Sequence, residues 1–136
     1  MLPKTYRLRL ENETGQTLPS GDAVVTSNRW RYASGTPSFD SERTEYSLTS
    51  DLSDGSSDAG ATRDNSSGAA DGGLWVGGWF VFEVDAPASV SGYYAWYLEV
   101  STDGGSTWND ALSGVPLMRI DVSSSGLVRR SRRLPV

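Results

Sequence analysis

The feature that most constrains the fold is a stretch of alternating aromatic residues that ends in a tight turn, between Tyr93 and Trp108. Side chains expected to face a core alternate with side chains expected to face away from it. The first set is Tyr94, Trp96, Leu98 and Val100, and the second is Tyr93, Ala95, Tyr97 and Glu99. This period of two is typical of a strand that packs on one side. Asp103-Gly104-Gly105 tolerates positive φ, so we expect the chain to reverse there.

The same alternation recurs along the chain, in segments separated by residues rich in Gly, Ser and Pro. The further strand-like segments are 5–11, 23–33, 43–50, 74–85, 115–123 and 127–134. No segment has the spacing of an amphipathic helix, and a chain of 136 residues is long enough to bury one core. We therefore predict an all-β fold, a single-domain antiparallel β-sandwich or jelly roll of about seven to eight strands over residues 1–136.

Two of these segments carry specific expectations. The segment 23–33 has candidate core residues and candidate solvent-facing residues on alternate positions. The core candidates are Val24, Trp30 and Tyr32, and the solvent candidates are Arg29 and Arg31. A kink or bulge near Ser27-Asn28 would reconcile this set with the phase of Val24-Val25. The most hydrophobic segment, 74–85, is expected to be a central strand, and Gly77-Gly78 within it indicates a bulge or the close approach of a backbone or ligand.

Residues 50–73 differ from the rest because they are almost entirely Ser, Asp, Gly and Ala. Leu52 is the only large apolar residue there, so we expect a long, flexible, acidic surface loop. Aspartates could in principle gather a calcium ion, since calcium prefers several oxygen ligands. They are Asp51, Asp54, Asp58, Asp64 and Asp71. Their spacing fits no EF-hand loop and Arg63 interrupts them, so we expect no metal and no other cofactor.

The chain contains neither cysteine nor histidine. Disulfides and thiolate metal sites are thereby excluded, as are the usual general base at neutral pH and the commonest transition-metal ligand. Catalysis would have to rest on carboxylates, Tyr, Ser or the single lysine, Lys4. We therefore expect a protein that is not an enzyme.

Charge is unevenly distributed. Residues 1–128 hold 8 basic and 17 acidic residues, a net charge of −9, and the other basic residues are Arg129, Arg130, Arg132 and Arg133. An acidic body with a basic C-terminal strand or tail (127–136) favours contacts between unlike protein surfaces and argues against nucleic-acid binding. No apolar run approaches the ~18 residues of a membrane span, and no signal peptide is evident, so we expect no membrane association.

The turn after the aromatic strand, Ser101-Thr102-Asp103-Gly104-Gly105-Ser106-Thr107-Trp108, resembles the Asp-box motif at every specified position. The motif positions are Ser101, Asp103, Gly105, Thr107 and Trp108. The resemblance implies that Asp103 caps the turn, Gly105 takes a left-handed conformation and Trp108 folds back onto the hairpin. Asp-boxes are familiar from sialidase propellers, where they are structural. A sialidase would also need an arginine cluster and a tyrosine nucleophile in a much longer chain, so we expect a structural role here.

Outward-facing aromatic and basic side chains are the candidate binding groups. The aromatic candidates are Trp75, Trp79, Tyr93 and Tyr97, and the basic candidates are the four C-terminal arginines. Aromatic rings of this kind stack on sugars, but they also fill cores and subunit interfaces. The arginines suit an acidic partner surface, or they guard an edge strand against uncontrolled pairing.

The second half of the chain resembles small virion structural proteins of tailed bacteriophages. The resemblance runs from Ala86-Pro87-Ala88-Ser89-Val90 through the Asp-box hairpin to Ile120-Asp121-Val122 and the arginine strand. It implies a β-sandwich that decorates the capsid, neck or tail, acts through oligomeric contacts with other virion proteins, and is assembled into the virion in the host cytoplasm. We therefore expect a non-enzymatic structural component of a phage particle. The alternative is a carbohydrate-binding module that uses exposed Trp and Tyr.

Overall fold

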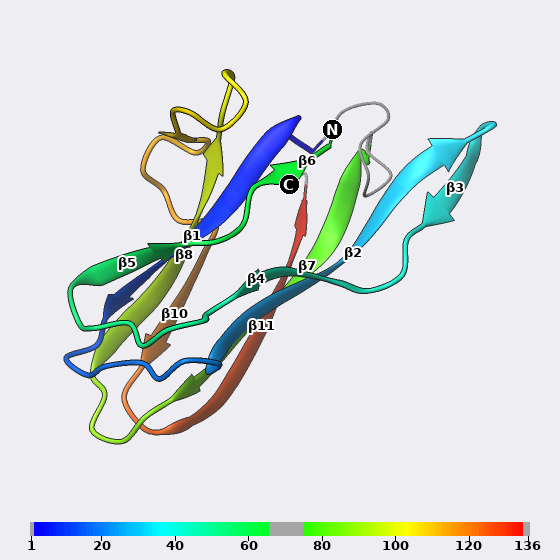
Figure 1. Cartoon of the computed structure of the whole chain (residues 1–136). Helices are drawn as coiled ribbons and strands as arrows, with labels where there is room; N and C mark the ends of the chain where they lie inside the picture. Colours follow the sequence, from blue (N-terminus) through cyan, green and yellow to red (C-terminus); the bar gives the residue numbers. More distant parts are fainter. Residues whose placement is uncertain (1, 66–74, 135–136) are drawn as a thin grey trace.

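The computed structural model of the chain describes residues 2–65 and 75–134, which form eleven strands and no helix. The strands are β1 (Thr5–Glu13), β2 (Ala23–Ala33), β3 (Thr36–Phe39), β4 (Arg43–Ser47), β5 (Ser56–Ala59), β6 (Arg63–Asp64), β7 (Gly77–Ala86), β8 (Gly92–Val100), β9 (Asn109–Asp110), β10 (Met118–Val122) and β11 (Gly126–Leu134). They make two antiparallel sheets that pack face to face (Figure 1). The predicted all-β sandwich is therefore confirmed, with more strands than expected because several are very short.

Sheet I has the order β10-β8-β1-β5, with β6 also paired to β1 and β9 to β8. Sheet II has the order β11-β7-β2-β3, with β4 also paired to β2. The core lies between them. Its largest fully buried members include Trp96, Tyr6 and Tyr94 from sheet I and Phe80 and Phe82 from sheet II. The rings of Phe82 and Trp96 meet edge to face at 5.4 Å, which joins the central strands of the two sheets.

Strand β8 has the expected alternation, with Tyr94, Trp96 and Leu98 buried against sheet II. Strand β7 is also as expected. It lies between β11 and β2, and Phe80 and Phe82 face the core. These strands were predictable because both carry large apolar side chains on strictly alternate positions.

The phase expected for β2 is wrong. β2 pairs with β7 without interruption from Ala23 to Trp30, so no bulge occurs near Ser27-Asn28. The uninterrupted period of two places Val25 and Arg29 inward. Consequently Val24 and Trp30 are only half-buried, and Tyr32 is exposed.

A bulge does occur opposite β2, in strand β4. Val25 pairs with Tyr46 and Thr26 pairs with Thr44, so Glu45 is the extra residue. Both Glu45 and Tyr46 are buried as a result, because the bulge interrupts the normal alternation.

The prediction of a long loop at residues 50–73 is wrong in part, because two short strands form within it. Strand β5 pairs with β1 along Arg9–Asn12, and β6 pairs with β1 at Thr5 and Tyr6. Leu52 is buried and bridges Leu18. These pairings use main-chain hydrogen bonds, so a composition poor in apolar residues did not prevent them. Residues 66–73 of the predicted loop lie outside the described residues.

The segment 34–40, which lies between two of the predicted strands, forms a hairpin with β2. Ser34 and Gly35 have φ of 52° and 77°, the left-handed pair that a two-residue hairpin turn requires. β3 then pairs with β2 from Thr36 to Phe39. The β2–β3 hairpin projects from the end of the sandwich (Figure 1).

Candidate functional site

The Asp-box turn is held by a dense set of short hydrogen bonds around one carboxylate. Asp103 Oδ1 accepts from the amides of Ser106 (3.0 Å) and Thr107 (2.8 Å) and from the hydroxyl of Ser101 (2.7 Å). Asp103 Oδ2 accepts from the Thr107 hydroxyl at 2.6 Å. Hydrogen bonds from Thr107 and Ser101 hold the pKa of Asp103 well below its usual range. Asp103 is therefore a turn-forming residue, because its oxygens are already engaged.

The other Asp-box residues complete the turn. Ser101 Oγ accepts from the amide of Gly105 at 2.8 Å, and Gly105 has φ of 100°. A Cβ at Gly105 would lie 3.5 Å from the Trp108 ring, which has folded back over the turn. The Arg7 guanidinium carbon lies 4.3 Å from the centre of that ring, so the turn is anchored to β1.

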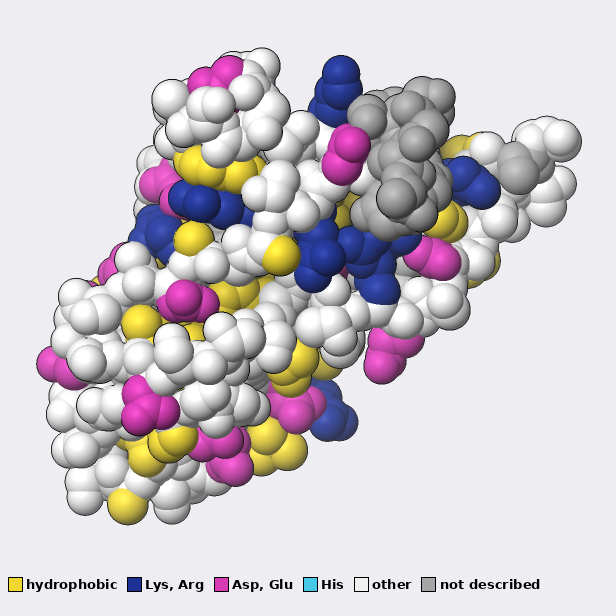
Figure 2. All heavy atoms as spheres, in the orientation of Figure 1, with side chains coloured by type: hydrophobic (Ala, Val, Ile, Leu, Met, Phe, Trp, Pro, Cys, Tyr) yellow, Lys and Arg dark blue, Asp and Glu magenta, His cyan; other side chains and the backbone are white. Residues whose placement is uncertain are grey.

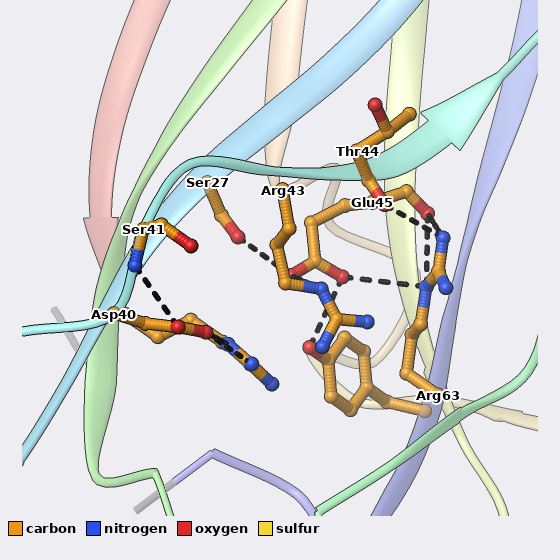
Figure 3. A network of polar contacts seen from close by, with 9 residues as sticks. Ser27, Asp40, Ser41, Arg43, Thr44, Glu45 and Arg63 are labelled. Atoms are coloured by element: carbon orange, nitrogen blue, oxygen red, sulfur yellow. Dashed lines mark hydrogen bonds and ion pairs between the residues drawn. The ribbon is translucent and has the colours of Figure 1, made fainter. Parts of the chain in front are cut away.

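A buried carboxylate, Glu45, lies between the two sheets and is fully partnered (Figure 3). Its oxygens accept from the Ser27 hydroxyl at 2.6 Å and from the Tyr6 hydroxyl at 3.2 Å. They also pair with Arg43 at 3.3 Å and Arg63 at 3.6 Å. Burial and the Glu45 charge raise the pKa of the Tyr6 hydroxyl. This cluster joins β4 to strands of both sheets, and its carboxylate is shielded from solvent.

The outer face of sheet I is a closed polar layer. Glu99 accepts from Arg7 at 2.6 Å and from Arg9 at 2.9 Å. The Arg9 guanidinium carbon lies 4.4 Å from the centre of the Tyr97 ring, and that of Arg119 lies 3.9 Å from the Tyr93 ring. Two of the predicted interface residues, Tyr93 and Tyr97, are therefore half-buried beneath arginine side chains.

Trp75, a predicted surface residue, is in fact 5% exposed. Its main chain is held by Asn65, which exchanges hydrogen bonds of 2.8 and 2.9 Å with it. The guanidinium carbons of Arg29 and Arg31 each lie 4.7 Å from the centre of its ring. Trp75 thus belongs to the core, and Arg29, expected in solvent, is buried against it and paired with Asp40 at 3.2 Å.

Trp79 lies in an open aromatic depression on the outer face of sheet II. The depression is lined by Trp30, Tyr32, Pro37, Phe39, Trp79 and Arg133. Three of its rings are among the most exposed large hydrophobic side chains in the described residues: Tyr32 at 67%, Phe39 at 69% and Trp79 at 50%. Figure 2 shows hydrophobic side chains at the surface around the β2–β3 hairpin. This is the surface feature of the fold that most needs an explanation.

Gly77 makes room for the Trp30 ring that lines this depression. A Cβ at this position would lie 2.4 Å from the Trp30 ring and 2.4 Å from the Leu134 carbonyl oxygen. The close approach expected from Gly77-Gly78 is therefore present, and the approaching groups belong to the same chain. Trp30, Tyr32 and Phe39 were missed as surface residues because the phase of β2 was misassigned and no strand was predicted at β3.

The four C-terminal arginines lie on β11 and point alternately to its two faces. Arg129 pairs with Glu83 on the neighbouring strand at 2.6 Å. Arg130 donates to the carbonyl of Arg129 at 2.9 Å, and Arg132 donates to the carbonyl of Leu117. The guanidinium carbon of Arg133 lies 5.9 Å from the centre of the Trp30 ring, at the edge of the aromatic depression.

The aspartates considered for calcium do not converge within the described residues. Asp51 accepts from the amide of Ser20, Asp54 from that of Gly15, and Asp58 from the Tyr46 hydroxyl. In residues 2–65 and 75–134 there is no group of three or more acidic side chains that could hold a metal ion. Asp71 lies outside this part of the chain.

Comparison with known proteins adds no relative. The chain matches no protein-family model, and neither a curated protein nor a solved structure is significantly similar to it. Among its described residues, none lie in a helix suited to cross a membrane.

Proposed function

We propose that the chain is a non-enzymatic structural component of a bacteriophage particle that acts through protein–protein contacts. The phage context comes from the sequence resemblance of the second half of the chain. The observation that supports a contact role is the aromatic depression of sheet II, where Tyr32, Phe39 and Trp79 are at least half exposed. Aromatic residues and arginine are the residue types enriched in protein interfaces, and Arg133 borders this depression.

The carboxylates with the densest surroundings also favour a structural role. Asp103 is engaged by its own turn, and Glu45 is enclosed between Ser27, Tyr6, Arg43 and Arg63. The oxygens of both carboxylates are thus already engaged by groups of the chain itself. The proposed location is the virion, where the chain would contact other virion proteins and further copies of itself.

The test is incorporation into particles of the phage whose genome encodes the chain. We expect mass spectrometry to detect the chain in purified particles. A double variant, Tyr32→Ser with Phe39→Ser, should reduce its abundance there at least severalfold, because it removes two exposed rings of the depression. Tyr97→Ser, on the covered face of sheet I, is the matched control and should be incorporated normally. A chain absent from particles, monomeric and without affinity for any particle protein would overturn the proposal.

A carbohydrate-binding module is the second candidate, favoured by the same depression. Trp79, Tyr32 and Phe39 offer open ring faces on a rigid sheet, which is the arrangement on which sugar rings stack. Glycan-array binding that is abolished by Trp79→Ala and retained by Tyr97→Ala would support this candidate. Absence of binding to any glycan would remove it.

A further inference from the structure

Strand β11 is a long, regular edge of sheet II. It pairs with β7 over nine positions, from Gly126 to Leu134, without any register shift. It stands at the end of the strand order, and within the described residues β7 is its only strand partner (Figure 1). A regular edge of this length presents a row of main-chain groups to which another strand can add.

The direction of these main-chain groups follows from two contacts. The carbonyl of Leu134 points toward β7, where it would meet a Cβ placed on Gly77. The carbonyl of Arg129 instead accepts from a side chain, that of Arg130. Because successive residues of a strand point their main-chain groups to opposite sides, positions 127, 129, 131 and 133 face outward.

The edge also carries positive charge that lacks acidic partners. Arg129 is paired with Glu83, but in the described part of the chain no carboxylate pairs with Arg130, Arg132 or Arg133. These guanidinium groups contact carbonyl oxygens or an aromatic ring instead. The charge is concentrated on one strand of a chain whose net charge is −5.

The charge selects among possible occupants of the edge. A second β11 strand would bring arginines close to arginines, which is unfavourable. An acidic strand would place carboxylates beside Arg130, Arg132 and Arg133 and would satisfy the outward amides at the same time. We propose that β11 binds an extended acidic segment of a partner protein, which adds to sheet II as a further strand.

This inference rests on the proposed function, since it specifies how a particle partner would be held. Its test uses no particle protein, so the two can fail separately. The full chain is titrated with a blocked nine-residue peptide of alternating Glu and Thr, and with a counterpart that has Lys in place of Glu. The Glu side chains of this peptide all lie on one face, where they can pair with Arg130 and Arg132, whereas Lys would be repelled there. We therefore expect the acidic peptide to bind roughly tenfold more tightly or better. Amide exchange at Ser131 and Arg133 should slow in the complex.

Two variants separate strand addition from simple charge attraction. Ser131→Pro removes an outward amide without removing a hydrogen bond to β7, so it should abolish binding, whereas Ser131→Ala should bind normally. Arg130→Ser with Arg132→Ser should weaken binding of the acidic peptide at least severalfold. Circular dichroism checks that each variant is folded.

A peptide methylated on every backbone nitrogen tests the same point without altering the protein. It retains every charge but cannot form the strand ladder, so it should bind at least tenfold more weakly. Equal binding of the methylated and unmethylated peptides would overturn strand addition. No binding of the acidic peptide at all would also overturn it, and the arginines would then serve only to keep other strands away from the edge.

Discussion

The outer faces of the two sheets carry similar aromatic residues but differ in how those residues are covered. On sheet I, Tyr97 lies directly across from Arg9, whose guanidinium covers its ring at 4.4 Å. On sheet II, Trp79 lies between Asn28 and Arg133. Arg133 lies near the Trp30 ring and does not cover Trp79, which remains half exposed.

The difference teaches that alternation alone does not identify a binding face. Both Tyr97 and Trp79 point away from the core on central strands, as the sequence predicts. Whether such a ring is available to a partner depends on the residue that lies across from it on the adjacent strand. The outward rings of sheet I are covered by its own arginines, which Glu99 holds in place. On sheet II, Tyr32, Phe39 and Trp79 remain at least half exposed.

The largest effect on the free energy of unfolding is expected at Glu45, whose charge is fully buried. Glu45→Ala leaves Arg43 and Arg63 without their carboxylate and leaves the Tyr6 hydroxyl without its acceptor. Breaking a buried pair in this way costs about 3–5 kcal/mol, which we expect as the loss in free energy of unfolding. Urea denaturation measures it. Glu42→Ala, at the exposed position immediately before β4, is the control and should change stability by less than about 0.5 kcal/mol.

The closed state of sheet I is tested by Glu99→Ala. This change leaves both Arg7 and Arg9 without the carboxylate they share. We expect a loss of about 1–3 kcal/mol in urea denaturation, less than for Glu45, because water can reach the released arginines. Asp121→Ala, which breaks the exposed pair with Arg119, should cost below about 1 kcal/mol. A cost for Glu99→Ala no larger than that of Asp121→Ala would show that sheet I is not closed by this network.

The sandwich itself was predictable from sequence because its central strands are strongly patterned. In β1, β7 and β8 the large apolar residues that face the core recur at every second position, although β8 also buries Ala95 and Glu99 on its other face. The Asp-box turn was predictable for a different reason: it is local, and its side chains bond to main chain at most four residues away. In both cases the determining interactions are encoded by residue type at short spacing.

The aromatic depression was not predictable because its determinants are nonlocal. The phase of β2 depends on burying Arg29, which a sequence pattern assigns to solvent. What makes Arg29 tolerable inside is its pair with Asp40 and its stacking on Trp75, a contact between distant segments. The bulge at Glu45 was equally unpredictable from sequence. The buried charge of Glu45 is balanced by Arg63 from β6, and β6 lies in a segment with a loop-like composition. The sequence signals of the site were Gly77 and the candidate binding residues Trp79 and Arg133.

The open state of sheet II predicts a small effect on stability. Tyr32→Ser and Phe39→Ser each remove a ring that is about two-thirds exposed, so each should change the free energy of unfolding by about 0.5 kcal/mol or less. Binding of a hydrophobic dye at the surface should nevertheless fall, because the exposed apolar area is smaller. Tyr97→Ser should show the opposite pattern, with a measurable loss of stability and unchanged dye binding. Equal stability losses on both sheets would contradict the comparison.

The smallest effect on stability is expected in the Asp-box turn. Its Trp108 ring lies beneath Arg7, next to the covered face of sheet I. Hydrogen bonds from Thr107 and Ser101 lower the pKa of Asp103 in the folded state, below the value of about 3.9 expected when the chain is unfolded. The stability that this carboxylate contributes is therefore present above about pH 4 and is lost as the pH falls through the folded-state pKa. Asp103→Asn cannot ionise, so its free energy of unfolding should decline less than that of the wild type below pH 4.

Thr107→Val sharpens this test because it removes the donor to Asp103 Oδ2 and leaves the carboxylate in place. Its acid-dependent loss of stability should fall between those of the wild type and Asp103→Asn, as the pKa of Asp103 would be less depressed. Urea denaturation at a series of pH values from about 2 to 6 gives the three slopes. Parallel slopes for all three proteins would mean that the carboxylate's hydrogen bonds do not hold the turn. The anchoring of Trp108 beneath Arg7 would then have to come from the packing of its ring alone.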